Sequence, residues 1–138
     1  MMKTNFTFDE LSKVFAKISK IENATAKQIR AEKKYDESSA IFDAEFAKYG
    51  YSFLYAPTEL TTLFDEKCSL RDIWEKAEKK TYKLVKDFAK LIEIGNGPTD
   101  WVEDDIKEYI NRRYFFNAGK VADHCKYLAV MAARKIEY

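Results

Sequence analysis

Glycine and proline are scarce in this chain, which contains four glycines and two prolines among its 138 residues. Folds rich in β-strands need frequent turns, and turns draw heavily on these two residues, whereas helical folds need few of them. The scarcity therefore argues against a strand-rich fold and favours long helices joined by short connections.

Residues suited to recognisable catalytic chemistry are also few: two cysteines, Cys68 and Cys125, and one histidine, His124. Two cysteines make no disulfide framework, so both are expected as free thiols that fill small apolar sites. Consecutive helical residues point about 100° apart, so His124 and Cys125 cannot by themselves form a Cys-His dyad. The sequence contains no glycine-rich phosphate loop, nucleophile elbow, CxxC pair or zincin motif. We therefore predict no catalytic residue, metal site or cofactor, and structural roles for His124 and Cys125.

Long apolar runs are missing as well. No stretch approaches the roughly 20 residues of a membrane span, and residues 1–8 contain no run typical of a secretory signal, so a cytoplasmic location without membrane contact is expected. The net charge is +1 although 34% of the residues are charged, which is typical of a soluble globular protein. The length suits one core, so residues 1–138 are predicted to form a single all-helical domain.

The most informative pattern is an unbroken alternation of three- and four-residue steps through the first third of the chain, the spacing of a heptad seam. Its positions are Leu11, Val14, Ile18, Ile21, Thr25, Gln28, Glu32, Tyr35, Ser39, Phe42, Phe46 and Tyr49. The two ends of the seam are apolar or aromatic, and its middle is polar. The pattern predicts a long N-terminal helix or helical hairpin that either breaks near residues 23–25 or 36–39 or projects in part toward a partner.

Local signals mark the ends of this segment. Thr7 and Glu10 form a capping box, and Phe6 is placed to pack against Leu11, so the helix should begin near Phe8. Gly50 is the first residue at which the helix can end with little loss of free energy, because glycine adopts the left-handed conformation without steric cost.

Beyond Gly50, residues 51–55 are rich in aromatics and precede Pro57, which predicts an extended connector. A short helix is expected over 58–64. Ser69 carries a second capping signature, so another helix should begin there and end at the breaker Gly-Asn-Gly-Pro of residues 95–98.

Two further helices are expected, one from residue 99 or 100 to about Phe116 and one that lines the C-terminus. Residues 117–119 between them are either a kink or a turn. The predicted fold is all-α, a small bundle of four to six helices, of which three are long enough to lie antiparallel.

Aromatic residues make up 15% of the chain, more than a core of this size can enclose, so some must lie on the surface. Tyr35, Phe42, Phe46 and Tyr49 belong to the seam, and Tyr51 begins the connector. Rigid aromatic side chains are enriched where proteins bind one another. We predict these five as contact residues for another protein; the alternative is that they only cover the later helices.

Basic residues next to aromatics offer a second patch, Arg112, Arg113 and Tyr114, which could hold a phosphate backbone and stack bases. The competing interpretation is that arginines in the last turns of a helix complement its dipole. A near-zero net charge is also unlike a dedicated nucleic-acid binder. A strip of lysines between Lys79 and Lys90 could likewise hold a phosphate backbone. The alternative is that this strip pairs with the acidic residues that flank Phe42, such as Asp43.

Acidic residues on helices provide the remaining enzymatic alternative. Glu75 and Glu78 share a helix face, and Asp100 with Glu103, or Asp104 with Glu108, could add a second pair. These short acidic spacings resemble the carboxylate pairs on facing helices of all-α nucleoside triphosphate pyrophosphohydrolases. The resemblance implies Mg²⁺-dependent hydrolysis, whereas acidic residues at a helix start also interact favourably with the helix dipole.

If a helix runs through the polar middle of the seam, Thr25, Gln28 and Glu32 must face solvent or a hydrogen-bonding partner. An identical helix from a second copy of the chain could be that partner, so a homodimer is one hypothesis.

The favoured function is a non-enzymatic intracellular protein-binding module of an accessory or inhibitory type. By compositional analogy, short lysine-, glutamate- and aromatic-rich chains without motifs are common among accessory and phage-encoded proteins, including inhibitors of host defence nucleases. Nucleic-acid binding and nucleotide hydrolysis remain the alternatives.

Overall fold

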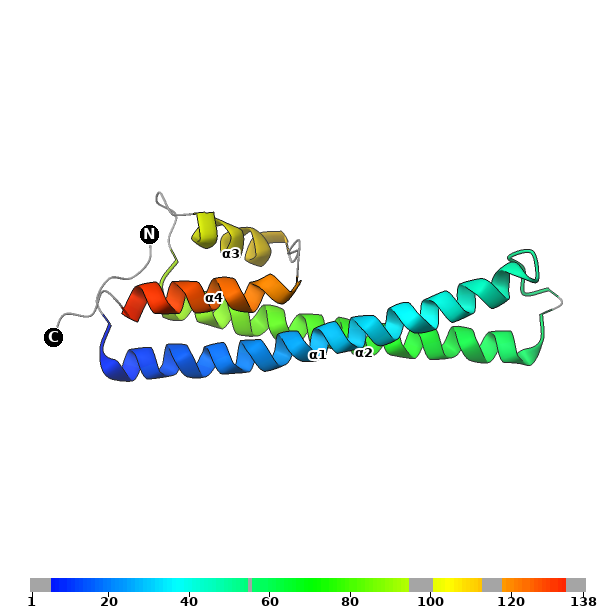
Figure 1. The fold of residues 1–138 in the computed structure, drawn as a ribbon, viewed down its shortest axis with the longest axis horizontal. Helices are drawn as coiled ribbons and strands as arrows, with labels where there is room; N and C mark the ends of the chain where they lie inside the picture. Colours follow the sequence, from blue (N-terminus) through cyan, green and yellow to red (C-terminus); the bar gives the residue numbers. More distant parts are fainter. Residues whose placement is uncertain (1–5, 55, 95–100, 113–117, 134–138) are drawn as a thin grey trace. The chain divides into compact units, whose positions relative to one another are not determined.

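The computed structural model describes residues 6–54, 56–94, 101–112 and 118–133. These residues form four α-helices and no strand: α1 (Phe8–Ala47), α2 (Thr58–Leu91), α3 (Trp101–Arg112) and α4 (Ala118–Ala133) (Figure 1). The all-helical class predicted from the sequence is therefore confirmed for this part of the chain. None of these helices combines the length and the apolar character that crossing a bilayer requires.

The first helix is continuous over 40 residues. It runs through residues 23–25 and 36–39, so neither break considered from the sequence occurs. Thr25 and Ser38, whose short polar side chains compete for backbone hydrogen bonds, are both buried. Packing against the rest of the chain thus outweighs their modest helix propensity.

The start of α1 is capped as predicted. The Glu10 amide donates a hydrogen bond to Thr7 Oγ1 (3.2 Å), and the Thr7 hydroxyl donates one to Glu10 Oε1 (3.3 Å). Phe6 and Leu11 are buried in the same hydrophobic cluster, as expected for residues that flank a capped first turn.

The end of α1 is a Schellman motif centred on Gly50, which has a φ of +64°. The Gly50 amide donates to the Ala47 carbonyl (3.1 Å), and the Tyr51 amide donates to the Phe46 carbonyl (3.2 Å). The rings of Tyr51 and Phe46 meet edge to face with centroids 5.7 Å apart, which supplies the apolar contact that usually accompanies this motif. The predicted termination at Gly50 is confirmed.

The second helix departs from the expectation, because α2 runs without interruption from Thr58 to Leu91. The predicted division into a helix over 58–64 and another from Ser69 is wrong. Ser69 is exposed within α2, where a serine costs only about 0.5 kcal/mol of helix propensity. A capping signature acts locally, and it does not end a helix whose turns are packed on both sides of it, as the buried Leu60 and Val85 show.

The end of α2 also uses a left-handed residue, but not the glycine that the sequence suggested. Glu93 has a φ of +54°, its amide donates to the Lys90 carbonyl (3.2 Å), and the Ile94 amide donates to the Ala89 carbonyl (3.1 Å). The helix therefore ends before residues 95–98, which lie outside the described residues. A side chain in this conformation costs about 1–2 kcal/mol.

Replacing Glu93 by glycine is expected to raise the free energy of unfolding by about 1 kcal/mol, because glycine adopts a positive φ without that cost. Urea denaturation followed by circular dichroism would measure the change. Lys90→Gly is the matched control: it lies within the last turn of α2, where glycine should lower stability by about 1 kcal/mol. A loss of stability in both variants would contradict the left-handed capping role of residue 93.

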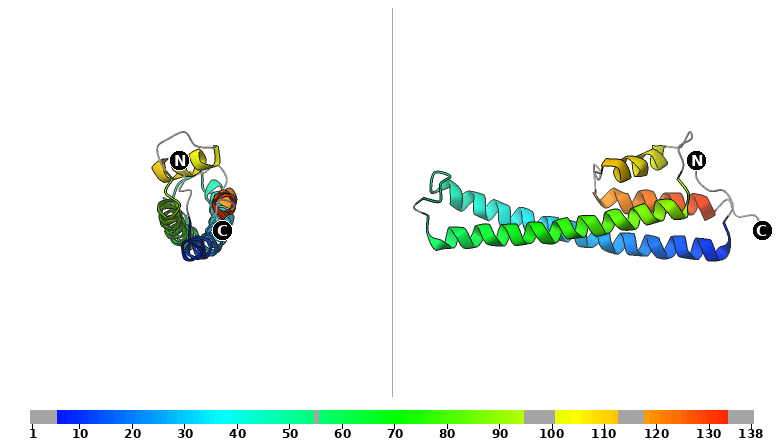
Figure 2. Two further views of the ribbon diagram at one scale, coloured as in Figure 1. Left: turned by 90° about the vertical axis from the view of Figure 1, so that its left-hand side faces the viewer. Right: turned by 180° about the vertical axis from the view of Figure 1, so that it is seen from behind.

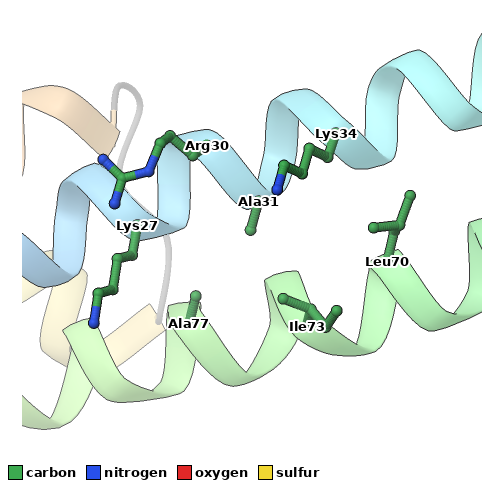
Figure 3. A pocket seen from close by; sticks show the side chains of 7 residues that line it. All are labelled: Lys27, Arg30, Ala31, Lys34, Leu70, Ile73 and Ala77. Atoms are coloured by element: carbon green, nitrogen blue, oxygen red, sulfur yellow. The ribbon is translucent and has the colours of Figure 1, made fainter.

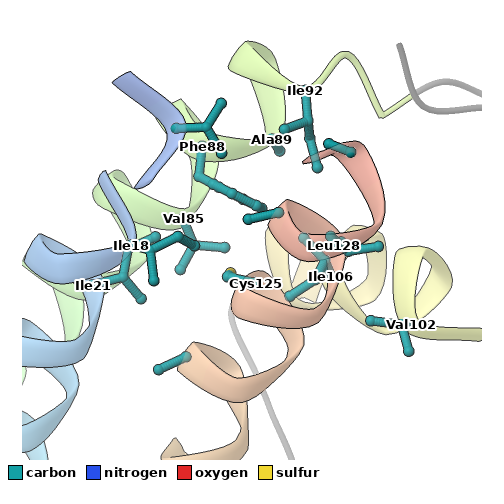
Figure 4. Packing of buried hydrophobic residues seen from close by; sticks show 14 of the residues in the cluster. Ile18, Ile21, Val85, Phe88, Ala89, Ile92, Val102, Ile106, Cys125 and Leu128 are labelled. Carbon is teal, nitrogen blue, oxygen red and sulfur yellow. The ribbon is translucent and has the colours of Figure 1, made fainter. Parts of the chain in front are cut away.

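The contacts of the chain form two compact units. Unit 1 comprises residues 1–26 and 79–138, and unit 2 comprises residues 27–78. In unit 1, α3 packs against α4 (Figure 2), and all four helices contribute to one hydrophobic core (Figure 4). The largest fully buried side chains of this core are Val14, Ile21, Val85, Phe88, Ile92, Ile106, Val121, Cys125 and Leu128.

The two cysteines occupy different environments. Cys125 lies fully buried in the core of unit 1, as expected, and burial raises the pKa of its thiol far above the ordinary value. Cys68 is exposed on α2, so the prediction that it fills an apolar site is wrong. Its neighbour Lys67 points toward Phe42 instead, and one residue along a helix turns the side chain by about 100°.

Unit 2 is a helical hairpin. Residues 27–47 of α1 and 58–78 of α2 run antiparallel, side by side in both views (Figures 1 and 2). Two ring pairs set the register: Tyr35 stacks on Trp74 (centroids 5.4 Å apart), and Phe42 contacts Phe64 (5.4 Å). Residues 48–57 connect the two helices, and the described part of this connection contains no strand.

Candidate functional site

An aromatic cluster closes the connected end of the unit 2 hairpin. Phe42 lies at its centre and is only 4% exposed. Its ring centroid lies 5.1 Å from Phe46, 5.4 Å from Phe64 and 6.2 Å from Phe53. Phe46 and Phe53 are 4.8 Å apart. Contacts between rings at these distances contribute beyond the burial of their area, so the cluster anchors the connection to both helices.

Beside this cluster, four apolar residues of the connection stay in contact with solvent. Tyr49 is 39% exposed, Tyr51 71%, Phe53 47% and Leu54 77%. These four residues are called the apolar loop surface. Single exposed apolar residues are ordinary on proteins, whereas several on one short connection make a candidate interaction surface.

The backbone of this loop is held in place by local hydrogen bonds. The Leu54 amide donates to Ser52 Oγ (3.2 Å), and the Ala56 amide donates to the Phe53 carbonyl (3.3 Å). Tyr51 has a φ of +58°, which is uncommon for a bulky residue and costs free energy. The fold therefore presents the Tyr51 ring at a strained but hydrogen-bonded position.

Charged residues surround the aromatic cluster. The Lys67 ammonium lies 5.1 Å from the Phe42 ring centroid and 3.8 Å from Asp43 Oδ1. Lys48 donates to Glu45 Oε1 (2.7 Å), and this hydrogen bond together with the carboxylate charge raises the Lys48 pKa. The Asp43 carboxylate thus has its cationic neighbour within unit 2, rather than in the lysine strip predicted from the sequence.

The five predicted contact residues have different surroundings. Tyr51 and Tyr49 are exposed and belong to the apolar loop surface. Phe46 and Tyr35 are half-buried in ring contacts. Phe42 is buried, so direct contact of its ring with a partner would require a rearrangement; its ring packs on Phe46 and Phe53 instead. The seam positions look alike in sequence, and only the packing separates them.

Leu54 was not predicted as a site residue, and Phe53 was recognised only as part of the connector. Leu54 is the most exposed of the large apolar residues described. One signal could have found it: a leucine between Gly50 and Pro57 lies in a connection too short to form its own helix. Such a residue has no helical face to bury it.

The second predicted patch is described only at Arg112. Its side chain is exposed and lies 2.9 Å from Glu108 Oε2, an i,i+4 ion pair at the end of α3. Arg113 and Tyr114 lie outside the described residues. The ion pair matches the interpretation of Arg112 as a surface residue at a helix end.

The polar middle of the seam does not behave as expected. Thr25 was predicted to face solvent or a partner, yet it is 4% exposed and is buried by its own chain. Gln28 is half-buried. Thr25 Oγ1 and Gln28 Oε1 have no hydrogen-bond partner among the described residues. Burial of a polar atom without a hydrogen bond costs free energy, so these two positions lower the stability of the packed helix.

The single histidine has a structural setting. His124 Nδ1 lies 2.8 Å from the Lys120 carbonyl oxygen, and Nε2 lies 3.1 Å from Asp105 Oδ2. The contact with Asp105 joins α4 to α3 within unit 1, and the contact with Lys120 lies within α4. Across the described residues, no three His, Cys, Asp or Glu side chains come together in a way that could hold a metal ion.

Carboxylates on one side of unit 2 repel each other. Burial raises the Glu78 pKa, and the neighbouring charges of Glu32 and Glu75 raise it further. Glu75 also accepts a hydrogen bond from Arg71 Nε (3.1 Å). The fold therefore holds Glu78 where its charged form is disfavoured.

A raised pKa in the folded state means that the folded chain binds the Glu78 proton more tightly than the unfolded chain does. The stability that this tighter proton binding contributes is fully present below the pKa of Glu78 in the unfolded chain. It is lost as the pH rises through the pKa of Glu78 in the folded chain. Glu78→Gln should therefore raise the urea midpoint at pH 7 and leave it little changed near pH 3. Glu37→Gln, an exposed site on α1, is the control; an equal gain there would contradict a local effect.

The comparisons with known proteins return no match: no family model, no curated protein and no solved structure is similar to this chain.

Proposed function

We propose that this protein is a small, non-enzymatic protein-binding module of the cytoplasm, a helical bundle that docks on another protein through the apolar loop surface. It would act as an accessory or inhibitory component for that partner. The proposal rests on the exposure of Tyr49, Tyr51, Phe53 and Leu54 in one connection, whose described residues form local backbone hydrogen bonds. Aromatic and aliphatic side chains of this kind form the buried centres of protein interfaces.

The order of the loop supports this proposal. Binding is weakened when a loop must be immobilised in the complex, and a loop already held in place avoids most of that loss. The Schellman motif at Gly50 and the ring contacts of Phe53 hold the connection before any partner arrives. The flanking charges, such as the exposed Lys48, would supply the polar rim that surrounds an apolar interface.

Two other function classes have less support. A nucleic-acid site would rest on the exposed lysines of α2 from Lys79 to Lys90, without exposed aromatic residues to stack on bases in between. A Mg²⁺-dependent hydrolase would need carboxylates that converge, and Glu75 is instead paired with Arg71. Both classes are distinguished from protein binding by the experiment below.

We expect affinity capture from cells that naturally contain the protein to retain one partner protein, and to lose it when Tyr51→Ser and Leu54→Asp are combined. Both changes lie in the exposed loop, so the fold should survive, which circular dichroism would check. Quantitative mass spectrometry of the captured proteins provides the measurement, and each capture is repeated after nuclease treatment.

The matched control combines Ile29→Asp and Tyr127→Ser, which alter equally apolar residues that are also exposed but lie outside the loop. This control should keep the partner. Equal capture by all three proteins would refute the apolar loop surface as the site. Loss of capture on nuclease treatment would instead favour the nucleic-acid class.

A further inference from the structure

Unit 2 carries a second surface, distinct from the apolar loop surface. It is a groove between the α1 and α2 segments, with a volume of about 320 Å³ and partly open to solvent; Figure 3 shows the side chains that line it. The groove is lined by Lys27, Arg30, Ala31, Lys34, Leu70, Ile73 and Ala77. All of these residues belong to unit 2, and together they are called the cationic groove.

One wall of the groove is a row of cations on α1. Lys27, Arg30 and Lys34 follow each other in steps of three and four residues, so they lie on one stripe of the helix and span about 10 Å along its axis. All three side chains are exposed. Among the described residues, none of them forms an ion pair, in contrast to Lys48, Lys67 and other cations of the chain.

The other wall is a row of aliphatic side chains on α2. Leu70, Ile73 and Ala77 also follow each other in steps of three and four residues and face the groove, with Ala31 of α1 between the rows (Figure 3). Ile73 is 56% exposed. When a ligand covers an aliphatic side chain that is this exposed, apolar area is removed from water, and this favours binding.

We propose that the cationic groove binds an acidic amphipathic helix of a partner protein. Such a helix would lay a stripe of Asp or Glu along the α1 cations and an adjoining stripe of aliphatic side chains on Leu70 and Ile73. Both rows of the groove have helical spacing, so a helix lying along it matches charge and apolar area at the same time. Docking an amphipathic helix into a groove is a recurring mode of recognition, and charge complementarity sets its orientation.

A small apolar anion fits the groove less well. Small-molecule sites bury most of their ligand in a volume of roughly 300–1,000 Å³, and this groove is at the lower end of that range and open along one side. The proposal goes beyond the function proposed for the apolar loop surface and does not depend on it, because the two surfaces share no residue.

The test uses a fluorescently labelled synthetic peptide, an alanine-based helix with Glu on one stripe and Leu on the adjoining stripe, and measures binding by anisotropy. We expect saturable binding that weakens as salt is added, because the attraction between exposed charges is screened. Combining Lys27→Glu with Lys34→Glu should weaken binding at least tenfold, and Ile73→Ser should do the same. Lys33→Glu, an exposed site outside the groove, should have little effect.

The peptide itself supplies a second set of controls that do not depend on the folding of any variant. A peptide with Lys in place of Glu should not bind, and one with Ser in place of Leu should bind at least tenfold more weakly. Tyr51→Ser with Leu54→Asp should leave peptide binding unchanged, so failure of the loop proposal and failure of this one are distinguishable.

Three results would overturn the proposal. They are the absence of saturable binding, equal binding of the Glu and Lys peptides, and equal binding by the protein with and without the groove substitutions. Vesicles of phosphatidylcholine with phosphatidylserine are tested in parallel. Groove-dependent binding to these vesicles without peptide binding would assign the surface to anionic lipid instead.

Discussion

Replacing Phe88 by alanine is expected to lower the free energy of unfolding by about 3–5 kcal/mol, the usual cost of deleting a buried phenylalanine ring. Phe88 is fully buried in the core of unit 1 (Figure 4). Proteins of this size are stable by only about 5–15 kcal/mol. The variant should therefore lose a large part of its stability, measured as the urea midpoint by circular dichroism.

Two further variants make this expectation specific. Leu91→Ala lies one turn further along α2, where the side chain is 37% exposed, so its loss should be well below that of Phe88→Ala. Phe88→Leu keeps most of the buried volume and should cost less than about 1.5 kcal/mol. Equal midpoints for the alanine variants at 88 and 91 would show that Phe88 does not occupy the core.

Phe42→Ala is the second substitution with a large expected effect, about 3–5 kcal/mol on the same grounds. Phe42 joins Phe46 of its own helix to Phe53 of the connection and Phe64 of α2, and the Lys67 ammonium lies over its ring. Deleting it leaves a cavity that these rings cannot fill. Amide hydrogen exchange is the suitable measurement, because it reports which residues lose protection.

The loss of protection should be greatest in residues 38–70 and smaller in the core of unit 1. Ile41→Ala is the matched control, since Ile41 precedes Phe42 on the same helix but is 55% exposed. Phe42→Ala should also weaken partner capture, because the loop loses its support. Uniform loss of protection along the chain would contradict the local role of this cluster.

The sequence predicted a helix end correctly where the capping residue lies within one turn of that end. The capping box at Thr7 and the glycine at position 50 are of this kind, since a side-chain hydrogen bond or a positive φ needs only neighbouring residues. The apolar start of the seam was informative for a similar reason. Leu11, Val14, Ile18 and Ile21 recur at helical spacing, and all four are buried.

Other features depend on residues far apart in the chain and were not predictable locally. Ser69 carries a capping signature, yet α2 passes through it because the turns before and after are packed. Thr25 was expected at a surface and is buried, and Cys68 was expected to be buried and is exposed. In each case, the outcome depends on packing and not on the residues next in the sequence.

By itself, the sequence indicated an all-helical fold, the capped start of the first helix, the glycine that ends its pattern and the excess of aromatic side chains. It left open whether the first segment is one helix or a broken pair, and the structure shows one helix. The tertiary structure alone decided which of the large apolar side chains are covered: Phe42 is enclosed by rings from α2 and the connection, whereas Tyr51 and Leu54 remain exposed. It also brought the cations of α1 beside the aliphatic row of α2 to form the cationic groove. Helix formation follows from interactions within a few residues, but burial follows from which helical faces meet.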